Sequence, residues 1–479
     1  MMRIEGELRP ADLADRLERM WRLSAEKILS IEETCSAEQS APAVTVAGRY
    51  TARAWTSWTQ GFQFGSAILQ FDATGDARFL AIGRENTRRR MAPHVSHVGV
   101  HDHGFNNIST YGNLRRLMLE GRVPHDPREL EFYELALCVS GAVQASRWST
   151  TADGDGYIYS FNGPHSLFCD TIRSLRVLAV AHQLGHVLMG ENDKRISLLG
   201  RLIQHARSTA RYNVFYGEGR DIYDVCGRVA HESIFNRTDG RYRAPSSQQG
   251  YSPFSTWTRG LAWIMLGYAE ELEYMETRPT DELDAWGGRQ AVESMMLRAA
   301  TAACEFYLRE TPQDGIPYWD TGAPGLARLG DYLNRPADPL NPHEPVDSSA
   351  AAIAAQGLLR LGRYLARRGD AAAGRRFGQA GLTLLRTLLD EPYLGTDPHH
   401  QGILLHAIYH RPRGWDNTPP GATVPCGESC MWGDYHLREV ALLVQRMAGT
   451  PPPDSTNSAQ REPEQPPRRP YLTFFGPET

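Results

Sequence analysis

Two aspartates lie in short motifs whose composition suits acid and base chemistry. Asp102 lies in His101–Phe105, between two histidines and before a glycine, at the start of a run that is compatible with a helix. Asp170 follows an apolar stretch and has no basic residue before Arg173. Because burial in apolar surroundings raises the pKa of a carboxyl group, we expect a raised pKa at Asp170, which suits a general acid. Two carboxyl groups in unlike surroundings indicate acid and base catalysis on a sugar.

Each aspartate also has a purely structural interpretation. Asp102 suits the N-cap of the following helix, because Asp is among the preferred N-capping residues. Asp170 suits an ion pair with Arg173, which follows on the next turn of a predicted helix. Taken singly, neither motif decides between a catalytic and a structural role.

The stretch from residue 248 to residue 263 combines amides, an arginine and two tryptophans. Trp257 offers an apolar face for a sugar ring, Gln249 offers hydrogen bonds to hydroxyl groups, and Arg259 offers a clamp for a carboxylate. These are the groups that a uronic acid requires. The same residues also fit a structural role, with the tryptophans in the core and Arg259 in an ion pair. His231 allows the same two interpretations.

Histidines at positions 94, 97, 101 and 103 raise the question of a metal site. Their spacing matches no zinc motif, and histidines in loops commonly serve as hydrogen-bond donors. Cys426 and Cys430 lie four positions apart, but no second pair of ligands accompanies them. We therefore expect no metal ion.

The composition limits the classes of protein that fit. The 479 residues are 41% hydrophobic and 22% charged, with a formal net charge of −5, as in an ordinary globular protein. No basic run stands out, so we expect no nucleic-acid partner. Seven scattered cysteines indicate a reducing compartment rather than a disulfide framework. Because the first residues lack the apolar core of a signal peptide and no apolar run can span a bilayer, we expect a cytoplasmic protein.

Helical periodicity recurs along most of the chain, and no convincing alternating strand run appears, so we expect an all-α protein. The predicted helices cover residues 11–33, 66–74, 105–121, 127–149, 166–190, 195–211, 256–276, 285–310, 348–369, 371–390 and 431–448, with a further helix from residue 77. Several helices open with Ser or Thr, an aromatic residue and Gly. If six helical hairpins close into a ring, these N-termini face one central cleft, and the loop-like segments 215–255 and 311–347 form its walls.

These motifs occur together in one enzyme family. The chain resembles the unsaturated glucuronyl hydrolases, glycoside hydrolase family 88, from about residue 50 to residue 447. Seven short blocks carry the resemblance in the same order: Trp58–Phe62, His101–Phe105, Cys169–Asp170, Gln249–Gly260, Tyr318–Asp320, Asp347–Ala350 and Trp432–Tyr435. The resemblance implies a six-hairpin α/α barrel, a toroid of helices. We assign it to a catalytic domain of residues 1–448, followed by a Pro-rich tail of residues 449–479 that we expect to be disordered.

The resemblance also implies an activity. Enzymes of this family hydrate the C4=C5 double bond of the unsaturated uronic acid that polysaccharide lyases leave at a non-reducing end, with no cofactor and no metal. By this resemblance Asp170 is the general acid and base, and Asp102 is the second essential carboxylate. The resemblance further implies a set of residues that contact the substrate: His231, Gln249, Arg259, Trp58 and Trp257.

Three other functions remain compatible with the residues. One is an unsaturated rhamnogalacturonyl hydrolase acting on pectin fragments, and another is a non-catalytic carbohydrate-binding protein on the same barrel. The third is an inverting glycosidase, whose two carboxyl groups must leave room for a water molecule. In each case the expected partner is an oligosaccharide, and the protein is expected to be a monomer or a homodimer.

Some positions depart from the family pattern. They are Pro253, Phe254, His103 and the segment 409–418. We expect the segment and the two residues after Ser252 to shape the side of the cleft that holds the leaving sugar, and so to affect the choice of polymer. At His103 the expected effect is a change in the protonation of Asp102 or a shifted substrate.

Overall fold

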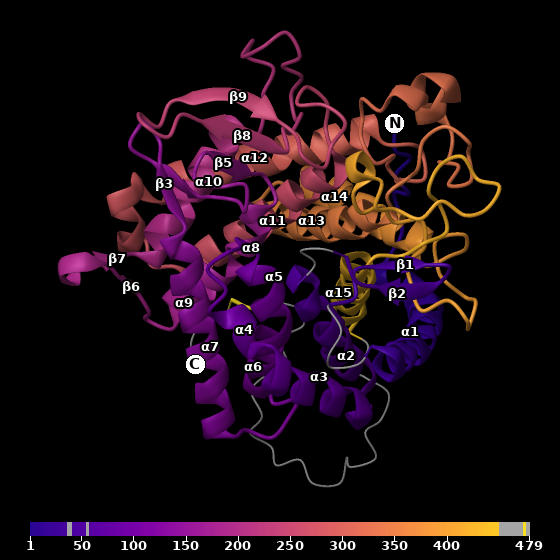
Figure 1. Ribbon diagram of the computed structural model, residues 1–479, viewed down its shortest axis with the longest axis horizontal. Coiled ribbons are helices and arrows are strands. Elements are labelled where there is room, and N and C mark those ends of the chain that lie inside the picture. The colour runs from indigo at the N-terminus through magenta and orange to yellow at the C-terminus, as the bar shows by residue number, and fades with distance from the viewer. Residues whose placement is uncertain (36–40, 54–56, 450–472, 476–479) are drawn as a thin grey trace.

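The computed structural model describes residues 1–35, 41–53, 57–449 and 473–475, and Figure 1 shows the described helices gathered into one body. The predicted tail therefore lies outside the described residues, apart from Gly449 and Thr473–Phe475. Within the described residues no helix is both long enough and apolar enough to cross a membrane. The helices form two concentric rings.

The inner ring is a closed circle of helical segments. In chain order they are α2 (Gln60–Thr74), α5 (His103–Asn107) with α6 (Asn113–Leu119), α8 (Thr171–Ser174) with α9 (Arg176–Gln183), α11 (Thr258–Thr277), α13 (Ser348–Arg367) and α15 (Met431–Met447). Each contacts the next, and α15 contacts α2, which closes the ring. Between α5 and α6 the chain makes a π-helical turn, η3 (Ile108–Gly112). Such turns occur frequently at functional sites.

The outer ring consists mainly of the helices that connect one inner segment to the next. The helices α3 (Ala77–Arg90), α7 (Pro127–Ser146), α10 (Leu198–Tyr212), α12 (Gly288–Glu310) and α14 (Ala371–Leu388) each pack against the inner segment that precedes them. The sixth outer position is taken by α1 (Ala14–Thr34), which contacts α15 and α2. The result is the expected α/α barrel of six hairpins, whose last hairpin joins segments from opposite ends of the sequence.

Motif glycines allow the inner helices to approach one another closely. A Cβ atom at Gly104 would lie 2.0 Å from the carbonyl oxygen of Ser174, and one at Gly61 would lie 2.3 Å from that of Asn106. Only glycine fits at such contacts between main chains. The glycines in the two motifs that contain Trp58 and Asp102 therefore set the packing of α2, α5 and α8.

The predicted helix 166–190 is wrong at both of its ends. It begins with a strand, β5 (Ser166–Phe168), and it ends in β6 (Leu188–Met189), with only α8 and α9 between them. β5 forms an antiparallel sheet with β8 (Glu232–Phe235) and β9 (Tyr242–Ser246), which Figure 1 shows at the edge of the helical body. The remaining strands pair as two-stranded hairpins: β1 (Val44–Val46) with β2 (Arg49–Thr51), β3 (Trp148–Thr150) with β4 (Gly156–Ile158), and β6 with β7 (Arg195–Ile196).

The three-stranded sheet places two candidate site residues beside each other. Asp170 follows β5 after one residue, and His231 immediately precedes β8. The amide nitrogen of Cys169 donates to the carbonyl oxygen of His231 over 2.9 Å, which joins the two strand ends. A pair of residues 61 positions apart in sequence thus meets at one edge of the barrel.

The segment Thr473–Phe475 packs against the barrel. Phe474 and Phe475 are 7% and 3% exposed. The guanidinium of Arg176 lies 5.3 Å from the centre of the Phe474 ring, and the Phe475 ring lies 5.0 Å from that of Tyr274. Because Tyr274 follows Thr258 by four and a half turns of α11, this contact lies about 24 Å along the helix from its N-terminus.

Candidate active site

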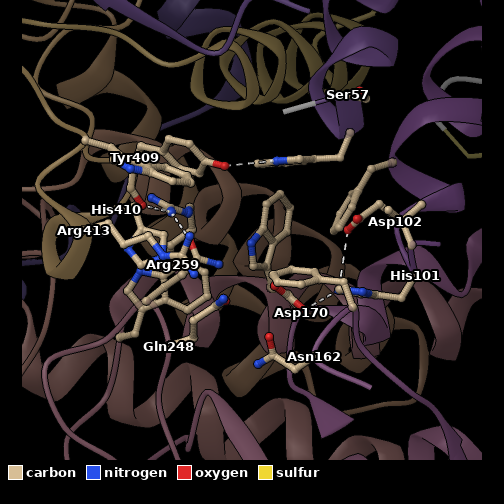
Figure 2. Close-up of a pocket in the computed structure, with 18 of the residues that line it drawn as sticks. Ser57, His101, Asp102, Asn162, Asp170, Gln248, Arg259, Tyr409, His410 and Arg413 are labelled. Carbon is tan, nitrogen blue, oxygen red and sulfur yellow. Dashed lines mark hydrogen bonds and ion pairs between the residues drawn. The ribbon is translucent and has the colours of Figure 1, made fainter. Parts of the chain in front are cut away.

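A cavity of about 720 Å³ opens where the inner helices α2, α5, α8 and α11 begin. This volume lies within the usual range for sites that bind small molecules. Figure 2 shows the lining side chains. The lining includes Trp58, His101, Asp102, Phe161, Asn162, Asp170, Gln248, Gln249, Trp257, Arg259, Tyr409, His410, Arg413 and Trp415. Both candidate catalytic residues and all the predicted contact residues except His231 are therefore part of the cavity wall.

Neither structural interpretation of the two aspartates is observed. Asp102 precedes α5 and Asp170 precedes α8, but neither side chain makes a capping hydrogen bond. Arg173 pairs with Glu270 and Glu439, at 3.0 Å each, and not with Asp170. Asp102 and Asp170 are 8% and 7% exposed. Buried carboxyl groups are costly unless they are paired, so two that serve neither structural role indicate a functional site.

His101 lies between the two carboxyl groups. Its Nε2 atom is 3.6 Å from Oδ1 of Asp102 and 3.5 Å from Oδ1 of Asp170. In the sequence, His101 stands in the motif around Asp102 and among four loop histidines, but no site role was predicted for it. Its position beside both aspartates makes it a member of the site.

The three groups shift one another's pKa values. Burial raises the pKa of Asp102 and nearby Asp170 adds to the rise, so the pKa stays above its ordinary value although His101 opposes it. At Asp170, burial also raises the pKa, but His101, His231 and Arg259 outweigh it and hold the pKa below the ordinary value. The expectation of a raised pKa at Asp170 is therefore wrong for this structure, because cationic and hydrogen-bonding neighbours counter the desolvation.

Arg259 is fully engaged by the protein itself. Its Nη1 atom donates to Oδ2 of Asp347 over 3.0 Å and to the carbonyl oxygen of Ile408. Its Nη2 atom donates to the carbonyl oxygen of Tyr409 over 2.7 Å and to Oε1 of Gln249 over 3.0 Å. Since the amide oxygen of Gln249 is held by Arg259, the amide nitrogen of that residue is left to donate. Arg259 thus positions other lining groups.

His231 lies behind the cavity wall and supports it. Its Nδ1 atom accepts hydrogen bonds from the backbone nitrogens of Gln248 and Gln249, over 3.0 and 3.3 Å. Because Nδ1 is an acceptor, the hydrogen of the neutral ring is on Nε2, which is buried without a partner among the described residues. Burial lowers the pKa of His231, which favours the neutral ring. The ring packs between Phe168 and Trp257.

The loop at residues 409–416 lines the cavity, within the segment 409–418 that we expected to shape the cleft. Asp416 accepts hydrogen bonds from the backbone nitrogens of Tyr409 and His410, which fixes the turn. The Nε1 atom of Trp58 lies 3.4 Å from the Tyr409 hydroxyl group and donates to it. Both ring nitrogens of buried His410 lack a partner among the described residues. A cluster of His, Arg and Trp within one loop is the sequence signal that marks this segment; Phe161 and Asn162 have no such signal.

The loop histidines are used for structure. His103 contacts Ser140 Oγ through Nδ1 and the carbonyl oxygen of His97 through Nε2, both over 2.9 Å. Burial lowers the pKa of His103 to about 4, so its ring is neutral near neutral pH. His94 contacts Asn106. In the part of the chain that the structure describes, no three His, Cys, Asp or Glu residues are arranged to hold a metal ion.

The predicted walls of the cavity are confirmed only in part. Gln248 and Gln249 come from the segment 215–255, whereas no residue of the segment 311–347 is among the described lining residues. That second segment supports the cavity wall without lining it, because Asp347 pairs with the lining residue Arg259. Figure 2 shows Asp102 and Asp170 on one side of the cavity and Arg259, His410 and Arg413 on the other. Burial lowers the pKa of His410 to about 3, so the positive charge on that side belongs to the two arginines. Such a site suits proton transfer to an anionic ligand.

The chain is similar in sequence and in fold to several known proteins. No family model matches the chain. An unsaturated glucuronyl hydrolase of Formosa agariphila is 24% identical over 398 residues, covering 81% of this chain and 80% of that protein. An unsaturated chondroitin disaccharide hydrolase of Streptococcus agalactiae is 21% identical, covering 81% of each chain. The crystal structure of an unsaturated glucuronyl hydrolase specific for heparin superimposes with a TM-score of 0.67 at 19% identity, over 90% of this chain and 96% of that one. The resemblance to these enzymes and the α/α-barrel fold are thereby confirmed.

Proposed function

We propose that this protein hydrates the C4=C5 double bond of an unsaturated uronic acid at the non-reducing end of lyase-generated oligosaccharides. The products are a 5-keto-4-deoxyuronate and the remaining sugar. The observation that carries the proposal is the pair of buried aspartates, Asp102 and Asp170, which face one cavity and serve neither as helix caps nor in an ion pair with Arg173. The names of the similar proteins support the same reaction class.

The chemistry requires one group that is first an acid and then a base. The substrate is an enol ether, because the double bond is attached to the ring oxygen. Protonation of C4 creates a cation at C5 that the ring oxygen stabilises, and water then adds to C5 while a base takes its proton. The hemiketal that forms opens by itself and releases the leaving sugar. We assign both proton transfers to Asp170.

The other residues bind and orient the sugar. Asp102 lies beside the reacting end of the cavity, where a carboxylate stabilises the developing positive charge. Trp58 and Trp257 offer ring faces, and the amide nitrogen of Gln249 donates to the substrate. Arg259 and His231 act by fixing the main chain and the amide around them.

The state of Asp170 depends on the substrate. In the structure its pKa lies below the ordinary value, so the group is a carboxylate near neutral pH. An unsaturated uronate brings a second negative charge into the buried site. Like charges raise each other's pKa, so binding of the uronate favours the protonated acid that the first step needs.

We place this activity in the cytoplasm. The seven cysteines are all unpaired, which supports a reducing compartment. The protein acts there as a monomer or a homodimer on short oligosaccharides.

The test is the loss of the ultraviolet absorbance of the conjugated double bond. Unsaturated disaccharides from chondroitin, hyaluronan and heparin serve as substrates, and Asp170→Asn is the variant. Asparagine cannot deliver the proton, so we expect turnover to fall by roughly 10²- to 10⁴-fold. The change Asp76→Asn, at a partly exposed position, is the control and should leave the rate unchanged, because that residue caps α3, pairs with Arg78 and is not among the residues that line the cavity. Stable absorbance with every substrate would refute the proposal for these sugars.

A further inference from the structure

The imidazole of His101 is nearly equidistant from the two carboxyl groups. The distances from Nε2 are 3.6 Å to Asp102 and 3.5 Å to Asp170, both longer than an ordinary N–H···O hydrogen bond of about 2.7 to 3.2 Å. A movement of a few tenths of an ångström toward either oxygen makes one hydrogen bond and breaks the other contact. The ring is therefore placed to serve either carboxyl group, but not both equally well.

The surroundings fix the main chain of His101 and the plane of its ring. The carbonyl oxygen of His101 accepts hydrogen bonds from Nε2 of Gln144 over 2.8 Å and from Oγ of Ser174 over 2.9 Å. Phe161 stacks on the imidazole at 5.8 Å, and Phe168 meets it edge-on at 5.5 Å. These aromatic contacts restrict the tilt of the ring, so the motion that remains is a small shift of Nε2 toward one carboxyl oxygen or the other.

The two nitrogens of the ring have different roles. Nε2 faces two carboxyl oxygens, so it must carry a hydrogen to avoid repulsion between lone pairs. Nδ1 is buried and has no hydrogen-bond partner among the described residues. A proton therefore has no path through the ring from Nδ1 to Nε2. What the ring can change is the oxygen to which the Nε2 hydrogen is donated.

On the premise of the proposed function, we propose that His101 is a positioning residue that transfers its Nε2 hydrogen bond between Asp102 and Asp170 during the reaction. At each step the Nε2 hydrogen bond is made to the carboxyl group that is ionised and has no contact with the substrate. One N–H group thereby serves two buried carboxyl groups in turn, while the transferred proton moves only between Asp170 and the reacting molecules.

The steps balance in protons and electrons. First, the O–H bond of the Asp170 carboxylic acid breaks, and the π electrons of C4=C5 form the new C4–H bond, which leaves a cation at C5. Asp170 is then a carboxylate, and His101 turns its hydrogen bond from Asp102 to Asp170. Next, water forms a C5–O bond and gives its proton to Asp170. The hydrogen bond of His101 then returns to Asp102.

Other titratable groups set the field around this ring. The pKa of His101 is raised, because Asp102 and Asp170 outweigh its burial, while Arg147 opposes them. His205, from α10, accepts a hydrogen bond from the backbone of Ile158 through Nδ1, and burial lowers its pKa to about 3. The titratable and charged groups that face the ring are Asp102, Asp170, Arg147, His205, His231 and, on its own loop, His97.

The first experiment compares pH profiles of kcat/KM for His101→Leu and His101→Gln. Leucine removes the donor, whereas glutamine keeps an N–H group near the position of Nε2. Loss of the donor raises the pKa of both carboxyl groups, so the whole profile of His101→Leu should move upward by about one pH unit, with a roughly 10- to 100-fold lower rate. His101→Gln should recover part of both changes.

The matched control is His103→Gln. This neighbouring histidine is equally buried but bonds to Ser140 and to the backbone of His97. Its replacement should lower the melting temperature and leave the pH profile in place. A lower rate of His101→Leu with an unshifted profile would mean a purely structural role and would overturn the inference while the proposed function stands.

A second measurement needs no substrate. Histidine-selective NMR follows the titration of His101, assigned by its absence in His101→Gln. In Asp102→Asn and in Asp170→Asn the pKa of His101 should fall in each case, because each variant removes one neighbouring negative charge. A fall in only one variant would show that the ring serves a single carboxyl group. This outcome is independent of activity, so it decides the inference even if no unsaturated sugar is turned over.

Discussion

At the scale of single residues, neighbouring charges affect the pKa values of the two site aspartates as much as burial does. Asp102 and Asp170 are almost equally buried, yet their pKa values move in opposite directions. The difference arises because the contact with His101 lowers the pKa of Asp170 most strongly, and His231 and Arg259 lower it further. Desolvation alone therefore does not identify the acid of this pair. In the proposed reaction, the negative charge of the bound uronate raises the pKa of Asp170 and so favours its protonated form.

This dependence on substrate charge can be tested with a methyl ester of the unsaturated uronate. The ester removes the negative charge beside Asp170, so the pKa of this group in the complex should be lower. Because the reaction needs protonated Asp170, the alkaline limb of the kcat profile should move to lower pH by about one unit relative to the free acid. Hydration of the ester with an unmoved alkaline limb would show that the uronate carboxylate does not control Asp170.

Residue types in the sequence were enough to locate the site but not to assign every partner. Trp58, Trp257 and Gln249 line the cavity as the motifs indicated. For Arg259 the sequence left a carboxylate clamp and an ion pair both open, and its ion-pair partner Asp347 lies 88 residues away. Residues that far apart leave no local pattern in the sequence, so only the folded structure shows that acceptors within the protein already bind the Arg259 guanidinium.

At the scale of elements, Glu428 joins the first hairpin to the last loop of the barrel. Its carboxylate accepts hydrogen bonds from Thr45 Oγ1 over 2.5 Å, from the backbone nitrogen of Ala47 over 2.8 Å and from Asn417 Nδ2 over 2.7 Å. Burial raises the pKa of Glu428, but the hydrogen bonds from His400, Thr45 and Asn417 outweigh it and lower the pKa to about 2. The connection between β1–β2 and the segment before α15 thus depends on an ionised carboxylate.

Glu428→Gln should therefore destabilise the protein in a pH-dependent way. A depressed folded-state pKa contributes stability above the unfolded value near 4.5, and this contribution disappears as the pH falls toward 2. At pH 7 we expect a loss of about 3 kcal/mol in the free energy of unfolding, measured with urea. The loss should shrink through the window from about 4.5 to 2. Exposed Glu191→Gln is the control, and an equal loss for Glu428→Gln at all pH values would contradict this account.

The helices were predictable, whereas the sheet that holds the site was not. Helices such as α1, α13 and α14 extend over many turns, so their apolar period is visible in the sequence. β5 and β8 have three and four residues, and Ser166 pairs with Ile234 across 68 positions. Strands of that length show no alternation, and their formation depends on a partner far away in sequence. The positions of Asp170 and His231 relative to each other could not be predicted for this reason.

At the scale of the whole molecule, one end of the barrel holds the cavity and the other contributes apolar packing. The cavity opens where α2, α5, α8 and α11 begin. Toward the other end of α11, Phe474 and Phe475 are buried against side chains of the barrel. Apolar burial there stabilises the fold without contact with the site.

The double variant Phe474→Ala with Phe475→Ala should lower the stability of the protein without changing its activity. Burial of each ring contributes about 1.5 to 3 kcal/mol, so the melting temperature should fall by several degrees. The kcat and KM values at 25 °C should remain those of the unchanged protein, because the contact lies about 24 Å along α11 from the cavity. Phe132→Ala, at a side chain that is 43% exposed, is the control and should cost less. An unchanged melting temperature would mean that this segment does not stabilise the barrel.

The aromatic lining of the cavity has a practical consequence for spectroscopy. Trp58, Trp257, Trp263 and Trp415 line it, out of ten tryptophans in the chain. Indole emission responds to changes in polarity and in nearby charge, so a sugar that enters the cavity alters a large share of the protein's intrinsic fluorescence. The protein thus carries its own optical reporter of occupancy. In Asp170→Asn, where turnover is blocked, that signal yields dissociation constants for intact substrates and separates affinity from chemistry.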